Sequence, residues 1–154
     1  MTSQFDPNAF LDSTTTDQST RLPPLPIGDY IASIDELKSN TWQSKDGTKS
    51  GYKFDVVLKV DPLSGPARDL KDIEWPPQLT VSDSIMLETT DSGAIDYGVG
   101  KNSRLRMYRE ATGLNVAGQS FSPRQLVGRQ IKVNISHREY QGDLFAQVGK
   151  LAKI

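Results

Sequence analysis

Apolar and polar side chains alternate most regularly between Tyr52 and Val60. This period of two predicts a β-strand with one buried face. We expect the core face to carry Tyr52, Phe54, Val56, Leu58 and Val60, and the polar face to carry Lys53 and Lys59. A preceding strand is predicted over Tyr30–Leu37. Between the two strands, residues 41–51 read as a turn-rich loop that contains Trp42, Lys45, the turn signal Asp46-Gly47 and Lys49.

Three further strands follow. Leu79–Thr89 places Leu79, Val81, Ile85 and Leu87 on one face, with Asp83 interrupting that face as a bulge or strand end. The last two strands are expected at Gln130–His137 and Leu144–Lys153, with Leu144, Ala146 and Val148 on one face. Residues 137–143 link them as a hairpin that offers His137, Arg138 and Tyr140.

A helix is expected between the third and fourth strands. Ser103 or Asn102 caps it, and Gly113 stands where a C-terminal glycine belongs. Leu105, Tyr108 and Ala111 follow helical spacing, while Arg104, Arg106 and Arg109 are expected to form a solvated face. Ser122, Pro123 and Gly128 predict a second short helix.

Three strands, a helix and two strands predict a mainly β fold, the five-stranded Greek-key barrel called the OB-fold. The domain would span residues 27–154. Residues 1–26 are rich in Ser, Thr, Asp, Gln and Pro and predict a flexible N-terminal arm. Its only apolar cluster lies within residues 5–11, where Asp6 is placed to cap a turn that begins at Pro7. We expect this cluster to dock on the domain's own surface. Residues 61–78 contain four prolines and read as an irregular connection.

Charge divides the chain into two halves. Residues 101–154 hold ten Lys or Arg against three acids, a net charge of +7, whereas residues 1–100 hold eight against sixteen, a net charge of −8. Segregated basic charge on ordered structure indicates a polyanionic partner, with nucleic acid as the first hypothesis. No basic helix offers a base-reading array for a major groove, so we expect contacts with the backbone and stacking.

Single-stranded nucleic acid requires cations for its phosphates and flat rings for its unpaired bases. The fold would bring together Trp42, Lys45 and Lys49 in the first loop, Lys53 and Lys59 on strand 2, Arg129 and Lys132 at the start of strand 4, and Arg138 and Tyr140 in the hairpin. Three aromatic residues remain open between contact and packing. Trp42 and Trp75 either contact ligand or cover the barrel ends, and Phe145 is either a stacking platform or packs under the helix.

Catalysis and metal binding find little support. The chain has no cysteine and one histidine, which excludes thiolate sites and disfavours zinc. Gly98–Ser103 fails as a phosphate loop because Ile95 stands where its first glycine is required. Ser136 and His137 are adjacent on one strand, so their side chains point to opposite faces. We therefore expect no enzyme, no cofactor and no metal. Without a signal peptide or a long apolar run, an intracellular protein is expected.

Several motifs resemble those of small single-stranded DNA-binding proteins encoded by tailed bacteriophages. They are Gly28-Asp29-Tyr30, Trp42-Gln43-Ser44-Lys45, Ser50-Gly51-Tyr52, Ala111-Thr112-Gly113-Leu114, Phe121–Gly128 and the Phe5–Phe10 segment of the arm. The resemblance implies an OB-fold protein that coats single strands during DNA replication and recombination, in the host cell cytoplasm. It further implies that Trp42, Lys45, Lys49, Tyr52, Arg138 and Tyr140 border the DNA groove. Tyr52 enters this set through the resemblance alone.

Partners are expected beyond DNA. Many single-strand binders recruit enzymes through an acidic C-terminal tail, whereas this sequence ends in residues 149–154 with two lysines. Contacts with replication or recombination proteins would therefore use the N-terminal arm or the acidic region 61–96, and self-association is possible. The competing hypothesis is a structural β-barrel of a virion or other assembly, whose arm would contact a neighbouring subunit.

Overall fold

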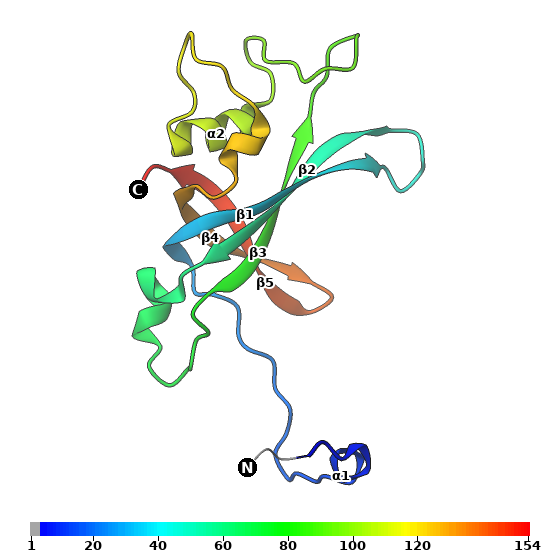
Figure 1. Ribbon diagram of the computed structural model, residues 1–154, viewed down its shortest axis with the longest axis vertical. Helices are drawn as coiled ribbons and strands as arrows, with labels where there is room; N and C mark the ends of the chain where they lie inside the picture. Colours follow the sequence, from blue (N-terminus) through cyan, green and yellow to red (C-terminus); the bar gives the residue numbers. More distant parts are fainter. Residues whose placement is uncertain (1–3) are drawn as a thin grey trace.

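The computed structural model describes residues 4–154 as a mainly β protein (Figure 1). Its elements are α1 (Pro7–Leu11), β1 (Gly28–Gln43), β2 (Ser50–Val60), the 3-10 helices η1 (Pro62–Ser64) and η2 (Pro66–Asp69), β3 (Leu79–Leu87), α2 (Ser103–Thr112), the 3-10 helix η3 (Pro123–Leu126), β4 (Gln130–Tyr140) and β5 (Asp143–Ala152). All five strands form one antiparallel sheet in the order β3-β2-β1-β4-β5. The edge strands β3 and β5 also lie near each other, outside the hydrogen-bonded ladder.

The period-two pattern of β2 places its apolar side chains as expected, with one exception. Phe54, Val56, Leu58 and Val60 are buried in the core. Tyr52 points to the same side of the strand, yet 55% of its surface is exposed. The prediction that Tyr52 is internal is therefore wrong. Its position lies beyond the end of the core, where the β1–β2 hairpin projects as a ribbon (Figure 1).

β1 is longer than predicted and serves two partners. It pairs with β4 from Gly28 to Ser33 and with β2 from Ala32 to Gln43, so that Ala32 and Ser33 have a partner on both sides. The register shifts between Ile34 and Glu36, so Asp35 forms a bulge. A bulge bends and twists a strand. The bend lets one strand join both halves of the sheet, and Trp42 lies on this strand instead of in a loop.

Asp83 marks neither a bulge nor a strand end, because the β2–β3 register runs through Val56 and Asp83 without a shift. Its carboxylate faces inward and accepts hydrogen bonds from Tyr108 Oη at 2.6 Å and Arg104 Nη2 at 2.7 Å. Arg104 Nη1 also donates to the Gly149 carbonyl on β5, at 2.8 Å. The network ties α2 to β3 and β5, and a half-buried carboxylate with partners is tolerated where an isolated one is costly.

The remaining caps are close to expectation. Gly113 ends α2 in the left-handed conformation, and Ser122 with Gln125 forms a capping box on η3. Asn102 precedes α2 with φ of 49° and does not cap it through its side chain. Its amide instead bonds the backbone of Glu88 and Asp96, which closes the loop after β3.

The β4–β5 hairpin is longer than predicted. Both strands continue to the turn residues Gln141 and Gly142, whose φ values are 51° and 82°. Positive φ at both central residues is typical of a type I′ turn, whose twist matches the paired strands. His137 is not free at this hairpin, because its Nε2 lies 2.6 Å from the Leu25 carbonyl oxygen.

The N-terminal arm contacts the domain through its last residues, among them Arg21 and Leu25. Leu25 is buried in the core, whereas the described residues 4–23 are exposed. Asp6 caps α1 as expected, by accepting from the backbone of Asn8 and Ala9. The expectation that the apolar cluster docks on its own domain is wrong, because Phe5, Phe10 and Leu11 remain 67–82% exposed. Residues 1–3 of the predicted arm lie outside the described residues. Across residues 4–154, every helix is too short or too polar to cross a bilayer.

Candidate nucleic-acid interface

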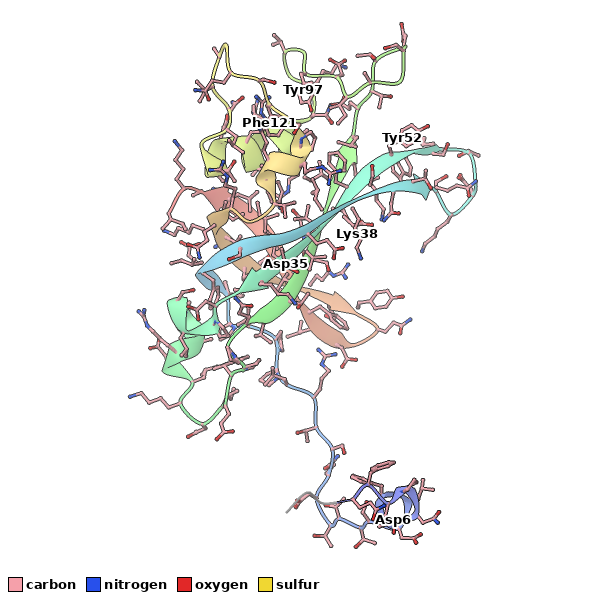
Figure 2. All side chains as sticks on the ribbon, in the orientation of Figure 1. Asp6, Asp35, Lys38, Tyr52, Tyr97 and Phe121 are labelled. Atoms are coloured by element: carbon pink, nitrogen blue, oxygen red, sulfur yellow. The ribbon has the colours of Figure 1, made fainter. Side chains whose placement is uncertain are left out.

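The outer face of β1, β2 and β3 carries polar and charged side chains in register, among them Lys38, whose Nζ lies 3.5 Å from Glu36. These are the residues that alternate with the core positions. One row runs from Lys38 through Asp55 to Ser84, and the next runs from Asn40 through Lys53 to Met86. The row nearest the hairpin tip pairs Trp42 with Gly51. We call this surface the outer face, and Lys38, one of its residues, is labelled in Figure 2.

Trp42 is seated against Gly51. A Cβ atom at position 51 would stand 2.7 Å from Trp42 Nε1, closer than such contacts are found. The indole is half-buried, and Nε1 is covered without a hydrogen-bond partner in residues 4–154. A glycine on the neighbouring strand thus makes room for the ring on the outer face. The other tryptophan, Trp75, packs against the core and donates its Nε1–H to the Ala67 carbonyl at 3.0 Å.

A polar network occupies the middle of this face. Lys53 Nζ lies 3.1 Å from Asp55 Oδ1, and Asn40 donates to the other carboxylate oxygen. The amide of Asn40, followed by Lys53, holds the pKa of Asp55 below its ordinary value. Asp55 therefore stays charged and orients the Lys53 ammonium on the sheet. It also offsets part of that positive charge.

A hollow opens between the edge strand β3 and the β4–β5 hairpin. Its lining includes Ser82, Asp83 and Ser84 from β3, Arg138 from β4 and Gln147 from β5, and the Asp83 carboxylate is paired with Arg104. Arg138 forms no ion pair within the described part of the chain. A guanidinium outside any ion pair is well suited to a phosphate, which it can contact through two parallel hydrogen bonds.

Aromatic rings flank this cation. Phe145 pairs with Arg138 across the hairpin, and Tyr140, 59% exposed, lies at the tip. Phe145 does not pack under α2: the guanidinium carbon of Arg21 lies 4.6 Å from its ring centroid. Arg21 also donates to the Leu144 carbonyl at 2.6 Å and lies 3.8 Å from Asp143. An arm residue thus covers a ring on the hairpin.

The first loop is ordered at its base and cationic at its tip. Asp46 Oδ1 accepts from the Ser44 hydroxyl and from the backbone and hydroxyl of Thr48. These bonds, with that of Ser44 the strongest, lower the pKa of Asp46 to about 2. Lys45 and Lys49 are exposed around this turn. The β1–β2 and β4–β5 hairpins project on the same side of the molecule, to the right in Figure 1.

Three of the predicted site residues lie away from this group, and a fourth, Tyr52, borders it from the other face of the ribbon. Tyr52 faces the opposite side of the ribbon from Trp42 and Lys53, and Figure 2 shows it across the ribbon from Lys38. It nevertheless lines one hollow with Trp42, Leu87 and Thr89. Lys59 bonds Thr80 at the far end of β2. Lys132 lies 3.7 Å from Asp29 and lines a separate hollow with Asn134 and Lys150. Arg129 is exposed just before β4 begins.

Two residues of the outer face escaped the sequence analysis. Lys38 follows the predicted end of the first strand, and Met86 is a polar-face position of β3 that carries an apolar side chain. The strand continues past Leu37, so the alternation of inward and outward side chains along β1 places Lys38 on the outer face. The Arg21–Phe145 contact joins positions 124 apart in sequence, and no local pattern signals it.

The sequence predicted that the three arginines of α2 are solvated, but two of them are held by other side chains. Arg104 is held by Asp83, and the Arg109 guanidinium carbon lies 4.2 Å from the Phe121 ring centroid. Only Arg106 behaves as expected, half-exposed and 3.6 Å from Glu110 on the next turn. Within residues 4–154 no group of three carboxylates or imidazoles gathers where it could hold a metal ion. Comparison with models of protein families and with curated protein sequences gave no match.

Proposed function

We propose that this protein binds single-stranded DNA, without enzymatic activity and with little sequence preference, through the outer face and the β4–β5 hairpin. The observation that supports it most strongly is the juxtaposition of Arg138, which forms no ion pair in residues 4–154, with the β3 edge of a face that carries Lys38, Lys53 and Trp42. Cations would bind phosphates, and Trp42, Tyr140 and Phe145 would stack on bases. Each stacked base contributes about 1–3 kcal/mol.

The topology supports an OB-fold as the finer description. β1 pairs with both β2 and β4, β3 lies near β5, and α2 falls between β3 and β4 in the chain. OB-folds bind oligonucleotides or oligosaccharides on the strand 2 and 3 face, between the loops that join strands 1 and 2 and strands 4 and 5. The outer face and the two projecting hairpins occupy the corresponding positions.

The resemblance to phage single-stranded DNA-binding proteins adds a biological role to this proposal. The protein would coat and protect single strands during phage DNA replication and recombination in the host cytoplasm. Replication or recombination proteins would bind the arm or the acidic region 61–96. Within the site, Trp42, Lys45, Lys49, Lys53, Arg138 and Tyr140 carry the proposal, while Tyr52, Lys59, Arg129 and Lys132 would play a smaller part.

A structural module of a virion is the second candidate, favoured by one observation. The apolar residues of α1 stay exposed at the end of an arm that leaves the domain (Figure 1). A mobility-shift assay at low salt with single-stranded oligo(dT) and a duplex of equal length separates the two. DNA binding predicts a shift of the single strand at lower protein concentration than the duplex. A purely structural module predicts no shift of either.

A further inference from the structure

A further hollow lies between α2 and the loop after β3. Its volume is about 220 Å³. Lys101, Arg106 and Arg109 line it together with Tyr97 and Val99, and no carboxylate does. Glu88 and Glu110 contact Lys101 and Arg106 from outside the lining, at 3.8 and 3.6 Å. We call this the α2 hollow. Its cationic lining favours an anionic occupant.

Two aromatic rings stand beside the cations of the α2 hollow: Tyr97 lines it, and Phe121 lies outside the lining, against Arg109. The Arg109 guanidinium carbon lies 4.2 Å from the ring centroid of Phe121 and 5.6 Å from that of Tyr97. Those two rings meet edge to face, and both residues are labelled near α2 in Figure 2. Arg109 Nε is covered and has no hydrogen-bond partner in residues 4–154. Val99 is fully exposed at the rim. An occupant with an aromatic side chain beside an acid would match this lining.

The arm contains such a segment. Phe5 and Phe10 touch through their rings, with centroids 5.1 Å apart, and are 69% and 67% exposed. Leu11 extends the same apolar cluster. Residues 4–20 hold the acids Asp6, Asp12 and Asp17 and no cation, a net charge of −3. An exposed aromatic cluster of this kind marks an interaction site.

We propose that α1 of one copy docks in the α2 hollow of a second copy. The charges are complementary, because an acidic segment meets three cations. The size also fits, because a cavity of about 150 Å³ holds a benzene molecule and the side chain of Phe10 ends in such a ring. α1 is already capped by Asp6, which lowers the entropy cost of ordering it on binding.

The geometry of the molecule favours contact between copies. α1 lies at one end of the molecule and the α2 hollow at the other, as the positions of Asp6 and Tyr97 show (Figure 2). The last contact that the arm makes with the domain, going toward its N-terminus, is that of Arg21 with the β4–β5 hairpin, and the arm leaves the domain on the side away from α2 (Figure 1). A contact between two different surfaces is head-to-tail, and it builds open chains unless its rotation closes a ring. Given the proposed function, such chains would make binding along a single strand cooperative.

Sedimentation velocity of the full chain at low salt, without DNA, tests the contact. We expect wild-type protein to form species larger than a dimer as its concentration rises. The arm variant Phe10→Ala/Leu11→Ala and the hollow variant Lys101→Gln/Arg106→Gln should each self-associate at least tenfold more weakly. The matched controls Leu63→Ala, an exposed apolar residue of η1, and Lys71→Gln/Lys153→Gln, with the same loss of charge, should behave as wild type. Circular dichroism checks that every variant is folded.

Mixing the two defective variants gives the sharpest result. The pair retains one intact α1 and one intact hollow, so the mixture should form a one-to-one dimer and nothing larger. A wild-type protein that stays monomeric, variants that associate as wild type does, or a mixture that stays monomeric would each overturn the proposal. None of these readouts involves DNA, so they are independent of the proposed function.

A second experiment, with DNA present, separates the proposed contact between copies from the proposed DNA binding. Both variants should bind a one-site oligo(dT) with wild-type affinity and lose cooperativity on a strand several sites long. Oligomers that form without any oligo(dT) binding would remove the proposed function and leave the copy contact standing. Equal cooperativity of wild type and both variants on the long strand would overturn the consequence drawn for DNA.

Discussion

The indole of Trp42 lies against Gly51, its partner across the β1–β2 ribbon, where any Cβ would stand 2.7 Å from Nε1. The strand pairing therefore requires a residue without a side chain at position 51. Trp42 itself is half-buried, so its ring presents one part to the sheet and another to solvent. That arrangement suits a ring on which a base can stack.

Gly51→Ala should displace the indole and weaken oligo(dT) binding by about 1 kcal/mol, the lower end of the value of a stacked base. The tryptophan emission should shift to longer wavelength as the ring gains solvent contact. Ser50→Ala, one residue earlier and exposed, serves as the control. Wild-type affinity together with unchanged emission in Gly51→Ala would show that the seat of Trp42 does not matter.

Trp42→Ala should weaken binding more than Tyr52→Ala, because the two rings lie on opposite faces of the ribbon. We expect a loss of about 1–3 kcal/mol for Trp42 and a clearly smaller one for Tyr52. Fluorescence anisotropy of a labelled oligo(dT) measures both. An equal or larger loss for Tyr52→Ala would mean that the strand runs along the inner side of the ribbon.

Arg138→Ala should lower the slope of log affinity against log salt by about 0.7, the release expected for one phosphate of a single strand. Lys132→Ala should leave the slope unchanged, because Lys132 contacts Asp29 and lines a different hollow. Titrations at four salt concentrations compare the two variants. The same slope change in both would place phosphates on the β4–β5 sheet surface instead of at the hairpin.

Tyr108→Phe should lower stability at pH 7 by roughly 1–2 kcal/mol, because it removes a hydrogen bond to the Asp83 carboxylate. Burial first, and the Asp83 charge second, raise the pKa of Tyr108 in the folded protein. Because the pKa of Tyr108 is higher in the folded than in the unfolded protein, the neutral phenol stabilises the fold. This stabilisation is fully present below the unfolded pKa of 10.0 and is lost as the pH rises above that value.

The difference in free energy of unfolding between wild type and Tyr108→Phe should therefore narrow as pH rises above 10, because only in the wild type can residue 108 ionise on unfolding. Urea denaturation from pH 7 to 11 follows it. Tyr30 and Tyr97, whose pKa values are also raised, are present in both proteins and cancel in the comparison. A gap that stays constant with pH would contradict the assigned burial of the phenol.

The sequence predicted the elements that local pattern controls. The alternation of β2, the third-strand face, Gly113 and the Ser122 cap needed only neighbours in the chain. The predictions were wrong where residues distant in the sequence determine the environment of a side chain. Asp83 looks like a break in a strand until Arg104 and Tyr108 arrive from α2. Tyr52 has a core pattern, but nothing covers the end of the ribbon.

The candidate site shows the same limit. Lys53 and Trp42 fall on one face because alternation and register place them there, but the turn-rich composition of residues 41–51 hid the strand that carries Trp42. Arg129 and Lys132 seemed equivalent to Arg138 as cations on β4 or beside it. The bend of β1 and the closing hairpin separate them, and these depend on pairing across the whole sheet.

The central claim is that charge and stacking on the outer face bind a single strand, and one titration tests it most directly. A Trp75→Phe variant leaves Trp42 as the only tryptophan, and oligo(dT) is added at 50 and 200 mM salt. The account predicts quenching of Trp42 emission and an affinity that falls steeply between the two concentrations. Tight binding indifferent to salt, or no binding at the lower salt, would contradict it.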